Sequence, residues 1–309
     1  MITKVSTVNM PHEEWLARRK KSIGGSDAAS VVGLNSFCSA YALWAEKTGR
    51  VPGFGGNLAT EVGAYLEEFV AKKFEQETGK KVRKENAFIY NDEYPWAHAN
   101  VDRVICNESA LLEIKTTSEL NMKSFKNGEY PSNYYAQCVH YLGITGRERC
   151  YLAVLIGNKE FKWFTIERDE AEIKALMAAE NEFWQCVTNN IPPALDGSES
   201  TDTALKTIFA ESTSREIDLT GVSNHIQMYV ALTKQIKELE IAKAQNEAEI
   251  KSYMRDACKG SYGNTSISWK TQSRKNFDRA KYEQTYGAIP DSFFKESTSR
   301  PFKVTVKEI

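Results

Sequence analysis

The run Ala110-Leu-Leu-Glu-Ile-Lys-Thr-Thr117 is predicted to form a β-strand that carries two charged residues on one face. Because side chains alternate between the two faces of a strand, Glu113 and Lys115 share one face and Leu112 and Ile114 share the other. Charged side chains are costly to bury unless they have partners. A charged pair on a strand that is expected to be central in a sheet therefore marks a candidate site.

The segment just before this strand supplies a second carboxylate. Asp102 precedes Glu113 by eleven positions, across a short turn at 107–109, so the two side chains are expected to meet. Adjacent carboxylates repel each other, but a divalent cation between them removes the repulsion, and Mg²⁺ prefers oxygen ligands. Asp102 and Glu113 are therefore predicted to bind Mg²⁺, with the Ile114 carbonyl as a further ligand. Lys115 would then orient or help to deprotonate an attacking water. The alternative is a salt-bridge network on an exposed sheet edge.

The triplet Glu-Ile-Lys has no diagnostic value by itself, because it occurs three times in this chain. The copies at 172–174 and 249–251 lie in charged, helix-like sequence, where Glu and Lys usually point to solvent and stabilise a helix. Only the copy at 113–115 lies in a strand-like run. We therefore expect Glu172 and Glu249 to tolerate substitution.

Two further polar residues lie on predicted helices. Glu67 is aligned with Gly63, Val70 and Phe74 at helical spacing, so it is expected to point towards the buried side. Gln137 lies one turn from Tyr134 and Tyr141 on a largely apolar helix face. Each is either a site residue or a solvated residue at the edge of its helix.

Helix-like and strand-like segments alternate around the strand at 110–117. Apolar residues recur at helical spacing over 60–78, and Gly79 supplies a stop signal. Further strands are predicted at 87–90, 96–106, 149–156 and 160–167, and further helices at 131–142 and 169–189. The strands at 87–90, 96–106 and 110–117 are expected to form a β-meander. The predicted order is helix, three strands, helix and strand pair.

A change in composition marks a domain boundary near residue 200. The Pro-Pro pair at 192–193 and the polar run at 196–203 end the first segment, so 1–200 is expected to be one domain and 201–309 an accessory region. Apolar residues over 222–258 keep mostly three-and-four spacing, which predicts a long helix or helical hairpin for assembly or for docking a partner. The alternative is that this apolar stripe packs on the first domain. Short strands are expected at 266–269 and 302–306.

The composition excludes several classes of protein. The 309 residues are 41% hydrophobic and 26% charged, as in ordinary soluble proteins. No apolar run approaches the roughly eighteen residues of a membrane-spanning helix, and the N-terminus lacks the apolar stretch of a signal peptide, so no membrane association and a cytoplasmic location are expected. The six cysteines are scattered without a C-x-x-C pair, which argues against a zinc or iron–sulfur site and predicts buried free thiols.

The net charge of −1 gives little sign of a nucleic-acid partner, but the positive charges are unevenly distributed. Basic clusters lie at 18–21, at 80–84 and between 270 and 281. Together they could line one surface, whereas each taken alone is the kind of cluster found on a solvated face.

Several of these segments resemble the lambda exonuclease family, the YqaJ-like phage recombination nucleases of the PD-(D/E)xK superfamily. The matches span roughly 10–195 and comprise the motifs at 15–26, 63–67, 102, 112–115 and 134–141. One departure is Val101, which replaces the proline that precedes the metal-binding Asp in the superfamily motif; valine should still suit a strand. The tail segments 268–272 and 297–302 also resemble the C-terminal region of the YqaJ-like branch.

The resemblance implies an α/β, restriction-endonuclease-like core with a central mixed β-sheet flanked by helices, plus a C-terminal helical appendage. The implied activity is Mg²⁺-dependent 5′→3′ degradation of one strand of linear double-stranded DNA, with Mn²⁺ able to substitute, to leave 3′ overhangs for phage-type recombination by strand annealing. The implied partners are duplex ends, a single-strand annealing recombinase and further copies of the chain in a ring-shaped trimer, inside a bacterial host. The implied catalytic residues are Asp102, Glu113, Lys115, Glu67 and Gln137, and Asp102, Glu113 and Ile114 are the implied metal ligands.

The resemblance also implies that Arg19 and Ser26 contact the 5′-terminal phosphate. Ser26 follows Gly24-Gly25, where a glycine turn is expected to open a helix and leave backbone N–H groups for an anion. Arg19 adds a planar fork that can grip two phosphate oxygens. The alternative is that Ser26 merely caps the helix and Arg19 is one of four solvated cations.

Two other functions compete with the exonuclease. One is a different nuclease of the same superfamily, either an endonuclease or a single-strand-specific enzyme. The other is a catalytically inert DNA-binding or scaffolding protein that keeps the fold, although the complete set of Asp102, Glu113 and Lys115 argues against inertness.

Overall fold

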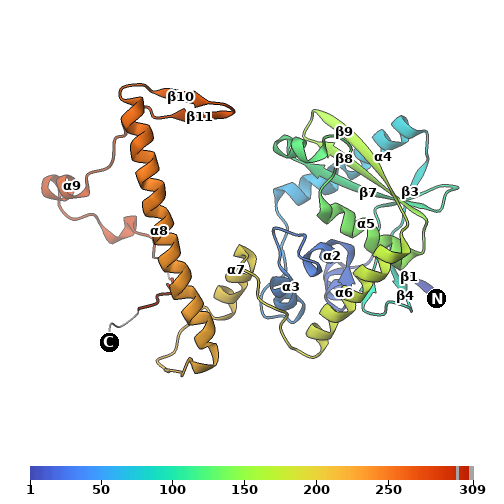
Figure 1. Ribbon diagram of the computed structural model, residues 1–309. Helices are drawn as coiled ribbons and strands as arrows, with labels where there is room; N and C mark the ends of the chain where they lie inside the picture. The colour runs from blue at the N-terminus through green and yellow to red at the C-terminus, as the bar shows by residue number, and fades with distance from the viewer. Residues whose placement is uncertain (297–298, 306–309) are drawn as a thin grey trace. The chain divides into compact units, whose positions relative to one another are not determined.

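The computed structural model describes residues 1–296 and 299–305 and divides the chain into two compact units, Met1–Ala210 and Glu211–Ile309 (Figure 1). The first unit extends past the predicted boundary near residue 200, because α7 (Glu199–Ile208) packs on α3 (Ala40–Lys47). Ala204 of α7 is buried in the same apolar cluster as Trp44 of α3. The polar run that suggested a boundary therefore begins a short helix of the first unit.

A five-stranded mixed sheet forms the centre of the first unit. Its strand order is β3-β6-β7-β8-β9, so β7 is the middle strand. β7 and β8 pair in parallel and the other neighbours are antiparallel. The strands are β3 (Val82–Lys84), β6 (Arg103–Ile105), β7 (Ala110–Thr117), β8 (Arg149–Ile156) and β9 (Glu160–Glu167). The predicted strands at 110–117, 149–156 and 160–167 are confirmed.

Helices cover the two faces of this sheet (Figure 1). α4 (Leu58–Thr78) buries Val70 and Phe74 against the apolar side of β7, and α5 (Ser132–Thr145) covers the side on which Glu113 lies. α4 is capped by the Asn57 side chain and ends at Gly79, whose positive φ of 71° suits a residue without a Cβ. α6 (Glu170–Thr188) packs on α5. The predicted α/β class with a helix-flanked mixed sheet is confirmed.

The predicted β-meander is only partly present: β6 and β7 pair antiparallel as expected, but the strand at 87–90 meets the run at 96–106 through the single bridge between Ile89 and Ala99. β4 (Ala87–Asn91) pairs with the N-terminal strand β1 (Ile2–Ser6), outside the five-stranded sheet. The run at 96–106 breaks into β5 (Ala97–His98), which pairs in parallel with β2 (Ile23–Gly24), and β6. The break leaves Asp102 outside regular strand structure, so its side chain is free to bond elsewhere in the sheet.

The N-terminal region contains elements that were not predicted in detail. α1 (His12–Lys20) leads through β2 into α2 (Gly25–Val31), so the glycine pair does open a helix as expected. The 3₁₀ helix η1 (Glu119–Phe125) follows β7. Among the cysteines, which are all free, Cys138 and Cys150 are buried as predicted, whereas Cys258 is exposed.

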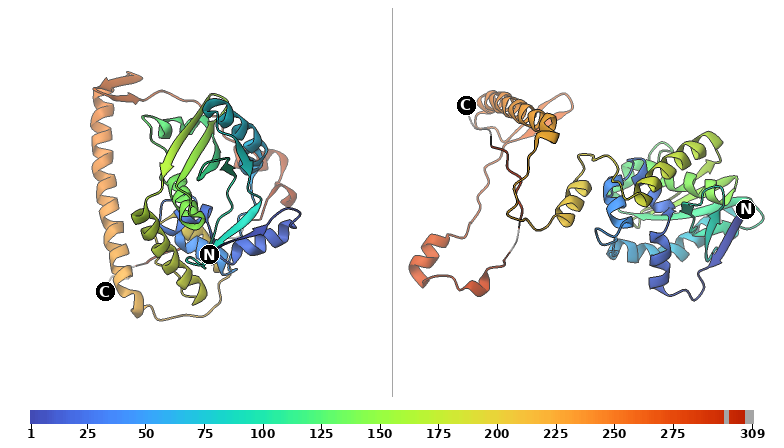
Figure 2. Two further views of the ribbon diagram at one scale, coloured as in Figure 1. Left: turned by 90° about the vertical axis from the view of Figure 1, so that its right-hand side faces the viewer. Right: turned by 90° about the horizontal axis from the view of Figure 1, so that it is seen from below.

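The second unit is built on one long helix, α8 (Ser223–Met254), which is a single rod (Figure 2). It is preceded by the 3₁₀ helix η2 (Thr220–Val222) and followed by the hairpin β10 (Lys259–Tyr262) and β11 (Thr265–Ser268), α9 (Arg279–Tyr286) and η3 (Asp291–Phe293). The helix and the strand predicted at 266–269 are thus present. The strand predicted at 302–306 is absent from 302–305, and Val306, like Ser297 and Thr298 of the tail motif, lies outside the described residues. Among the helices of the described part of the chain, none is long and apolar enough to cross a membrane.

Candidate active site

Three polar side chains form a closed hydrogen-bonded triangle between β7 and α5. Lys115 Nζ lies 2.7 Å from Glu113 Oε1 and donates a 2.8 Å hydrogen bond to Gln137 Oε1. Gln137 Nε2 donates back to Glu113 Oε1 over 2.7 Å. Glu113 and Gln137 are only 3% and 7% exposed. The strand alternation therefore does place both charges on one face, and Gln137 is a buried partner of that pair rather than a solvated residue.

Asp102 reaches the same strand from its edge. Asp102 Oδ2 accepts a 2.8 Å hydrogen bond from the backbone N–H of Ile114. β6 pairs with β7 only at Leu111 and Leu112, so the Asp102 side chain replaces the next ladder bond of the missing strand. In an extended strand the N–H and the C=O of one residue point to the same side, so the Ile114 carbonyl faces the Asp102 edge. The predicted ligands Asp102 and Ile114 are thus adjacent.

The donor set fits a hard divalent cation. Glu113 Oε2 is buried and has no hydrogen-bond partner among the described residues, and an unsatisfied buried carboxylate oxygen is costly. In the described part of the chain no three His, Cys, Asp or Glu side chains converge as a ready metal cluster. Mg²⁺ needs no such cluster, because it is usually bound through one or two carboxylates and keeps several waters. Asp102, Glu113 and the Ile114 carbonyl are a set of that kind.

The pKa shifts at the site reflect two carboxylates that are buried close together. Burial, followed by the charge of Glu113, raises the pKa of Asp102 well above its usual range. Burial alone would lower the pKa of Lys115, but Glu113 and Asp102 outweigh it and raise that pKa above the ordinary value. Lys115 therefore remains an ammonium at neutral pH.

Glu67 lies beside this cluster but is bound to another residue. It forms an ion pair with Arg103, whose guanidinium also donates a 2.8 Å hydrogen bond to the Asp102 carbonyl oxygen. Arg103 also contacts Glu68 at 3.2 Å and is 3% exposed. Glu67 is thus linked to Asp102 indirectly, because Arg103 bonds both residues. Sequence reasoning missed Arg103, although an arginine directly after the candidate metal-binding Asp, inside an apolar strand, was a signal.

Arg19 and Ser26 meet as predicted. Arg19 Nη2 donates a 2.7 Å hydrogen bond to Ser26 Oγ, and the guanidinium carbon lies 4.7 Å from the centroid of the Trp15 ring. The first turn of α2 also carries Asp27, which accepts a 3.0 Å hydrogen bond from the Gly24 N–H and pairs with Lys47 at 2.6 Å. The helix end is thus already occupied by a carboxylate, so attraction for a further anion depends mainly on the cationic side chains.

Burial alone would raise the pKa of Asp27, but the charges of Lys47 and Arg19 hold it below the usual range. Asp27 is therefore ionised at neutral pH. Lys47 also donates to the carbonyl oxygens of Arg19 and Ser22, at 2.9 and 3.0 Å. Lys47 and Asp27, both missed from the sequence, fix the end of α1 against the start of α2.

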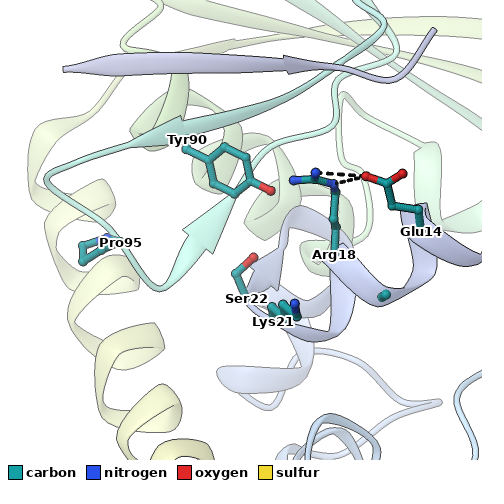
Figure 3. A pocket seen from close by; sticks show the side chains of 7 residues that line it. Glu14, Arg18, Lys21, Ser22, Tyr90 and Pro95 are labelled. Atoms are coloured by element: carbon teal, nitrogen blue, oxygen red, sulfur yellow. Dashed lines mark hydrogen bonds and ion pairs between the residues drawn. The ribbon is translucent and has the colours of Figure 1, made fainter. Parts of the chain in front are cut away.

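A pocket of about 330 Å³ lies on another side of α1 (Figure 3). It is lined by Glu14, Ala17, Arg18, Lys21, Ser22, Tyr90 and Pro95. Two cationic side chains, Arg18 and Lys21, line the pocket, and Arg18 is already paired with Glu14 at 2.9 Å. None of the predicted catalytic residues lines this pocket. The basic cluster at 80–84 is also partly paired, because Lys80, Lys81 and Arg83 contact glutamates.

Comparison with known proteins identifies relatives along almost the whole chain. Residues 14–148 match the YqaJ-like viral recombinase domain. The chain is 40% identical over 301 residues to an uncharacterized protein, YqaJ, of Bacillus subtilis (strain 168), and the match covers 96% of this chain and 94% of that protein.

Solved structures share the fold of a little more than half of this chain. An alkaline exonuclease from Laribacter hongkongensis, LHK-Exo, aligns with a TM-score of 0.50 and 23% identity over 58% of this chain and 94% of its own. The same enzyme in complex with dAMP aligns with a TM-score of 0.50 and 24% identity, with the same coverage. These alignments support the fold, and the long sequence match supports the family. This chain therefore belongs to the YqaJ-like viral recombinase family.

Proposed function

We propose that this protein is a metal-dependent DNA nuclease that degrades one strand of linear duplex DNA from its 5′ end. The observation that carries the proposal is the Glu113 carboxylate. One of its oxygens is held by Lys115 and Gln137, and the other is buried without a hydrogen-bond partner in the part of the chain that the structure describes. Burial raises the pKa of the Asp102 carboxyl, and Glu113 lies close enough for its charge to raise that pKa further. A salt-bridge network on an exposed sheet edge, the alternative, would leave the glutamate accessible to solvent, whereas Glu113 is 3% exposed.

In this proposal Asp102, Glu113 and the Ile114 carbonyl hold Mg²⁺, and Mn²⁺ is expected to substitute. When bound, such an ion activates water and offsets the charge that develops on the scissile phosphate. Gln137 keeps Glu113 Oε1 and Lys115 Nζ in one orientation, and the Lys115 ammonium orients a water or a phosphate oxygen. Glu67 and Arg103 support the backbone at Asp102.

The direction of degradation is assigned to Arg19 and Ser26. Their side chains already share a hydrogen bond, so a 5′-terminal phosphate would meet a guanidinium fork and a hydroxyl at one point. Gripping that phosphate would align the next linkage with the catalytic cluster, and such positioning is worth a large factor in rate.

The experiment compares a linear duplex with a covalently closed circular duplex, with Mg²⁺ and with EDTA. We expect nucleotide release only from the linear duplex and only with Mg²⁺, and faster release when the 5′ ends carry phosphate. Cleavage of the circle would identify an endonuclease, and preference for single strands would identify the single-strand-specific alternative.

A matched pair of variants separates catalysis from DNA binding. Glu113→Gln should abolish release, whereas Glu249→Gln, in the exposed third Glu-Ile-Lys triplet, should retain it. If neither the wild-type protein nor the variants release nucleotides while all bind duplex DNA, the protein is the inert DNA-binding scaffold.

The proposal includes two associations that follow from the family: assembly into a homo-oligomeric ring, and docking of a single-strand annealing recombinase. α8 supports both, because none of its residues is buried and it exposes large apolar side chains, among them Leu232, Ile236 and Leu239. Sedimentation of the full chain tests the first. Co-purification of the chain with a purified annealing protein, with and without residues 211–309, tests the second.

A further inference from the structure

We propose that Tyr141 is a positioning residue that fixes the distance between two parts of the site: the 5′-phosphate seat, formed by Arg19 and Ser26, and the catalytic triangle of Glu113, Lys115 and Gln137. This inference rests on the proposed function. Tyr141 lies on α5, one turn after Gln137, and is 5% exposed. Its hydroxyl accepts a 3.0 Å hydrogen bond from Gln137 Nε2, the same amide nitrogen that donates to Glu113. One end of the Tyr141 side chain is therefore tied to the catalytic triangle.

The ring of Tyr141 is tied to the phosphate seat through Gly25. A Cβ added at Gly25 would lie 2.7 Å from Tyr141 Cζ and 3.0 Å from Cδ1, which is too close for any side chain. Gly25 is the first residue of α2 and precedes Ser26, the hydroxyl partner of Arg19. The aromatic ring thus packs directly on the backbone that presents Ser26. Only glycine permits this approach, so the glycine pair serves the contact with α5 as well as the turn.

A second contact from α5 holds the same turn. His140 Nε2 lies 2.9 Å from the carbonyl oxygen of His98, and a Cβ at Gly24 would lie 3.1 Å from His98 Nε2. His98 also shares a 2.7 Å hydrogen bond with Ser22. Two consecutive residues of α5 therefore act on the turn: Tyr141 packs directly on Gly25, and His140 reaches Gly24 indirectly, through His98. Because α5 also carries Gln137, a single helix contacts both the turn that presents Ser26 and the catalytic triangle.

This arrangement predicts that crowding at Gly25 changes positioning more than folding. Moving a reacting group by about 1 Å can cost roughly a hundredfold in rate. Gly25→Ala should displace Ser26 from its place and reduce the rate ratio between 5′-phosphorylated and 5′-hydroxyl duplex at least about tenfold. Tyr141→Leu in the same chain removes the ring that the new methyl group meets. It should therefore restore a substantial part of that ratio.

The test measures single-turnover degradation of the two duplexes by the full chain with Mg²⁺, together with melting temperature. The variants are Gly25→Ala, Tyr141→Leu and their combination. Gly143→Ala serves as a control for crowding on α5, because its methyl group would meet Met177 Cε at 2.9 Å and Ile173 Cγ2 at 3.0 Å, both on α6, instead of Tyr141. We expect Gly143→Ala to keep the wild-type ratio. A Gly25→Ala protein with the wild-type ratio, or a double variant no better than Gly25→Ala, would overturn the proposal.

Tyr141→Phe provides a second measurement that does not depend on the folding of Gly25→Ala. It keeps the ring against Gly25 and removes only the hydroxyl that meets Gln137. We expect an unchanged phosphate ratio and only a small fall in melting temperature from the lost hydrogen bond, with kcat reduced about tenfold on both duplexes and little change in KM. An unchanged kcat would overturn the link to the catalytic triangle. A wild-type enzyme without any phosphate preference would instead refute the proposed 5′ anchor, and this inference would fall with it.

Discussion

Asp102 Oδ2 accepts its hydrogen bond from the backbone N–H of Ile114, the residue between Glu113 and Lys115 on β7. A carboxylate from outside the sheet thereby occupies a ladder position of the central strand. The bond needs only an acceptor, whereas binding of a cation needs the negative charge as well. Substitution by asparagine can therefore separate the two.

Asp102→Asn is expected to reduce nuclease activity by at least about a hundredfold while the fold is retained, because its amide oxygen can still accept from Ile114. Metal-induced stabilisation should disappear with the charge. The measurement is the melting temperature with and without Mg²⁺ or Ca²⁺, alongside nucleotide release. In the wild-type protein Ca²⁺ should raise the melting temperature without supporting turnover, because it shares the ligands of Mg²⁺ but has looser geometry. Full activity of Asp102→Asn would exclude Asp102 as a metal ligand.

Lys115→Ala is expected to lose turnover while retaining or improving Mg²⁺ affinity. The Lys115 ammonium lies 2.7 Å from the Glu113 carboxylate, so it competes with a cation for the same charge. Calorimetric titration with Mg²⁺ measures the affinity, and the duplex assay measures the turnover. Loss of Mg²⁺ binding in this variant would mean that Lys115 acts by holding Glu113 in place.

Arg19→Ala is expected to lose most of the preference for 5′-phosphorylated duplex with a smaller loss of initial DNA affinity. Arg19→Lys should also be impaired, because an ammonium cannot form two parallel hydrogen bonds to a phosphate. Arg18→Ala is the matched control, since Arg18 pairs with Glu14 and does not contact Ser26. If Arg18→Ala and Arg19→Ala change the preference equally, the basic run acts only through its overall charge.

Because of two buried histidines, the stability of the protein is expected to pass through a maximum as the pH is varied. Burial lowers the pKa of His98 from 6.5 to about 3, so its contribution is present above 6.5 and is lost as pH falls towards 3. Although burial opposes it, Glu180 raises the pKa of His140 above 6.5, so that contribution is complete below 6.5 and is lost as pH rises through the folded-state pKa. The other charged groups that influence this pair are Asp27, Lys47 and Arg19.

Thermal melts between pH 4 and 9 check this expectation. Wild-type protein should lose stability on both sides of the maximum. His140→Gln, whose amide can still donate to Glu180, should flatten the alkaline side. It should also weaken the acid side, because the charge of His140, after burial, helps to lower the pKa of His98. An alkaline slope that is the same in both proteins would show that His140 does not titrate differently on unfolding.

Truncation after residue 210 is expected to leave a cooperatively folding nuclease unit, whereas truncation after residue 198 is expected to leave a less stable one. The shorter chain lacks α7, which buries Thr201 and Ala204 against α3. Ser39 would also lose its bonds to Ser200 and Thr201, at 2.8 and 2.7 Å. Together these losses should cost about 2 kcal/mol or more. Urea unfolding of the two fragments measures the difference, and equal stability would mean that α7 is dispensable for the first unit.

Elements defined by local periodicity were predictable. The strand at 110–117 and the helix ending at Gly79 appear where the side-chain pattern placed them, because burial of one face sets period two in a strand and period 3.6 in a helix. The meander was not predictable in the same way. The pairing of β1 with β4 joins segments that are far apart in the chain. Alternation shows that a run can form a strand, but it does not show which other strand that run will pair with.

Residue type and strand alternation predicted Asp102, Glu113 and Lys115 as the residues that carry the chemistry, and a motif predicted Arg19 and Ser26. How these side chains are held depends on contacts between elements that no local pattern shows. The contacts of Gln137 with Glu113, of Arg103 with Glu67 and of Tyr141 with Gly25 each join different elements. Periodicity shows which face of an element is buried, but the residue that meets it depends on how helices pack on the sheet, and that packing is set by shape and volume across the whole core.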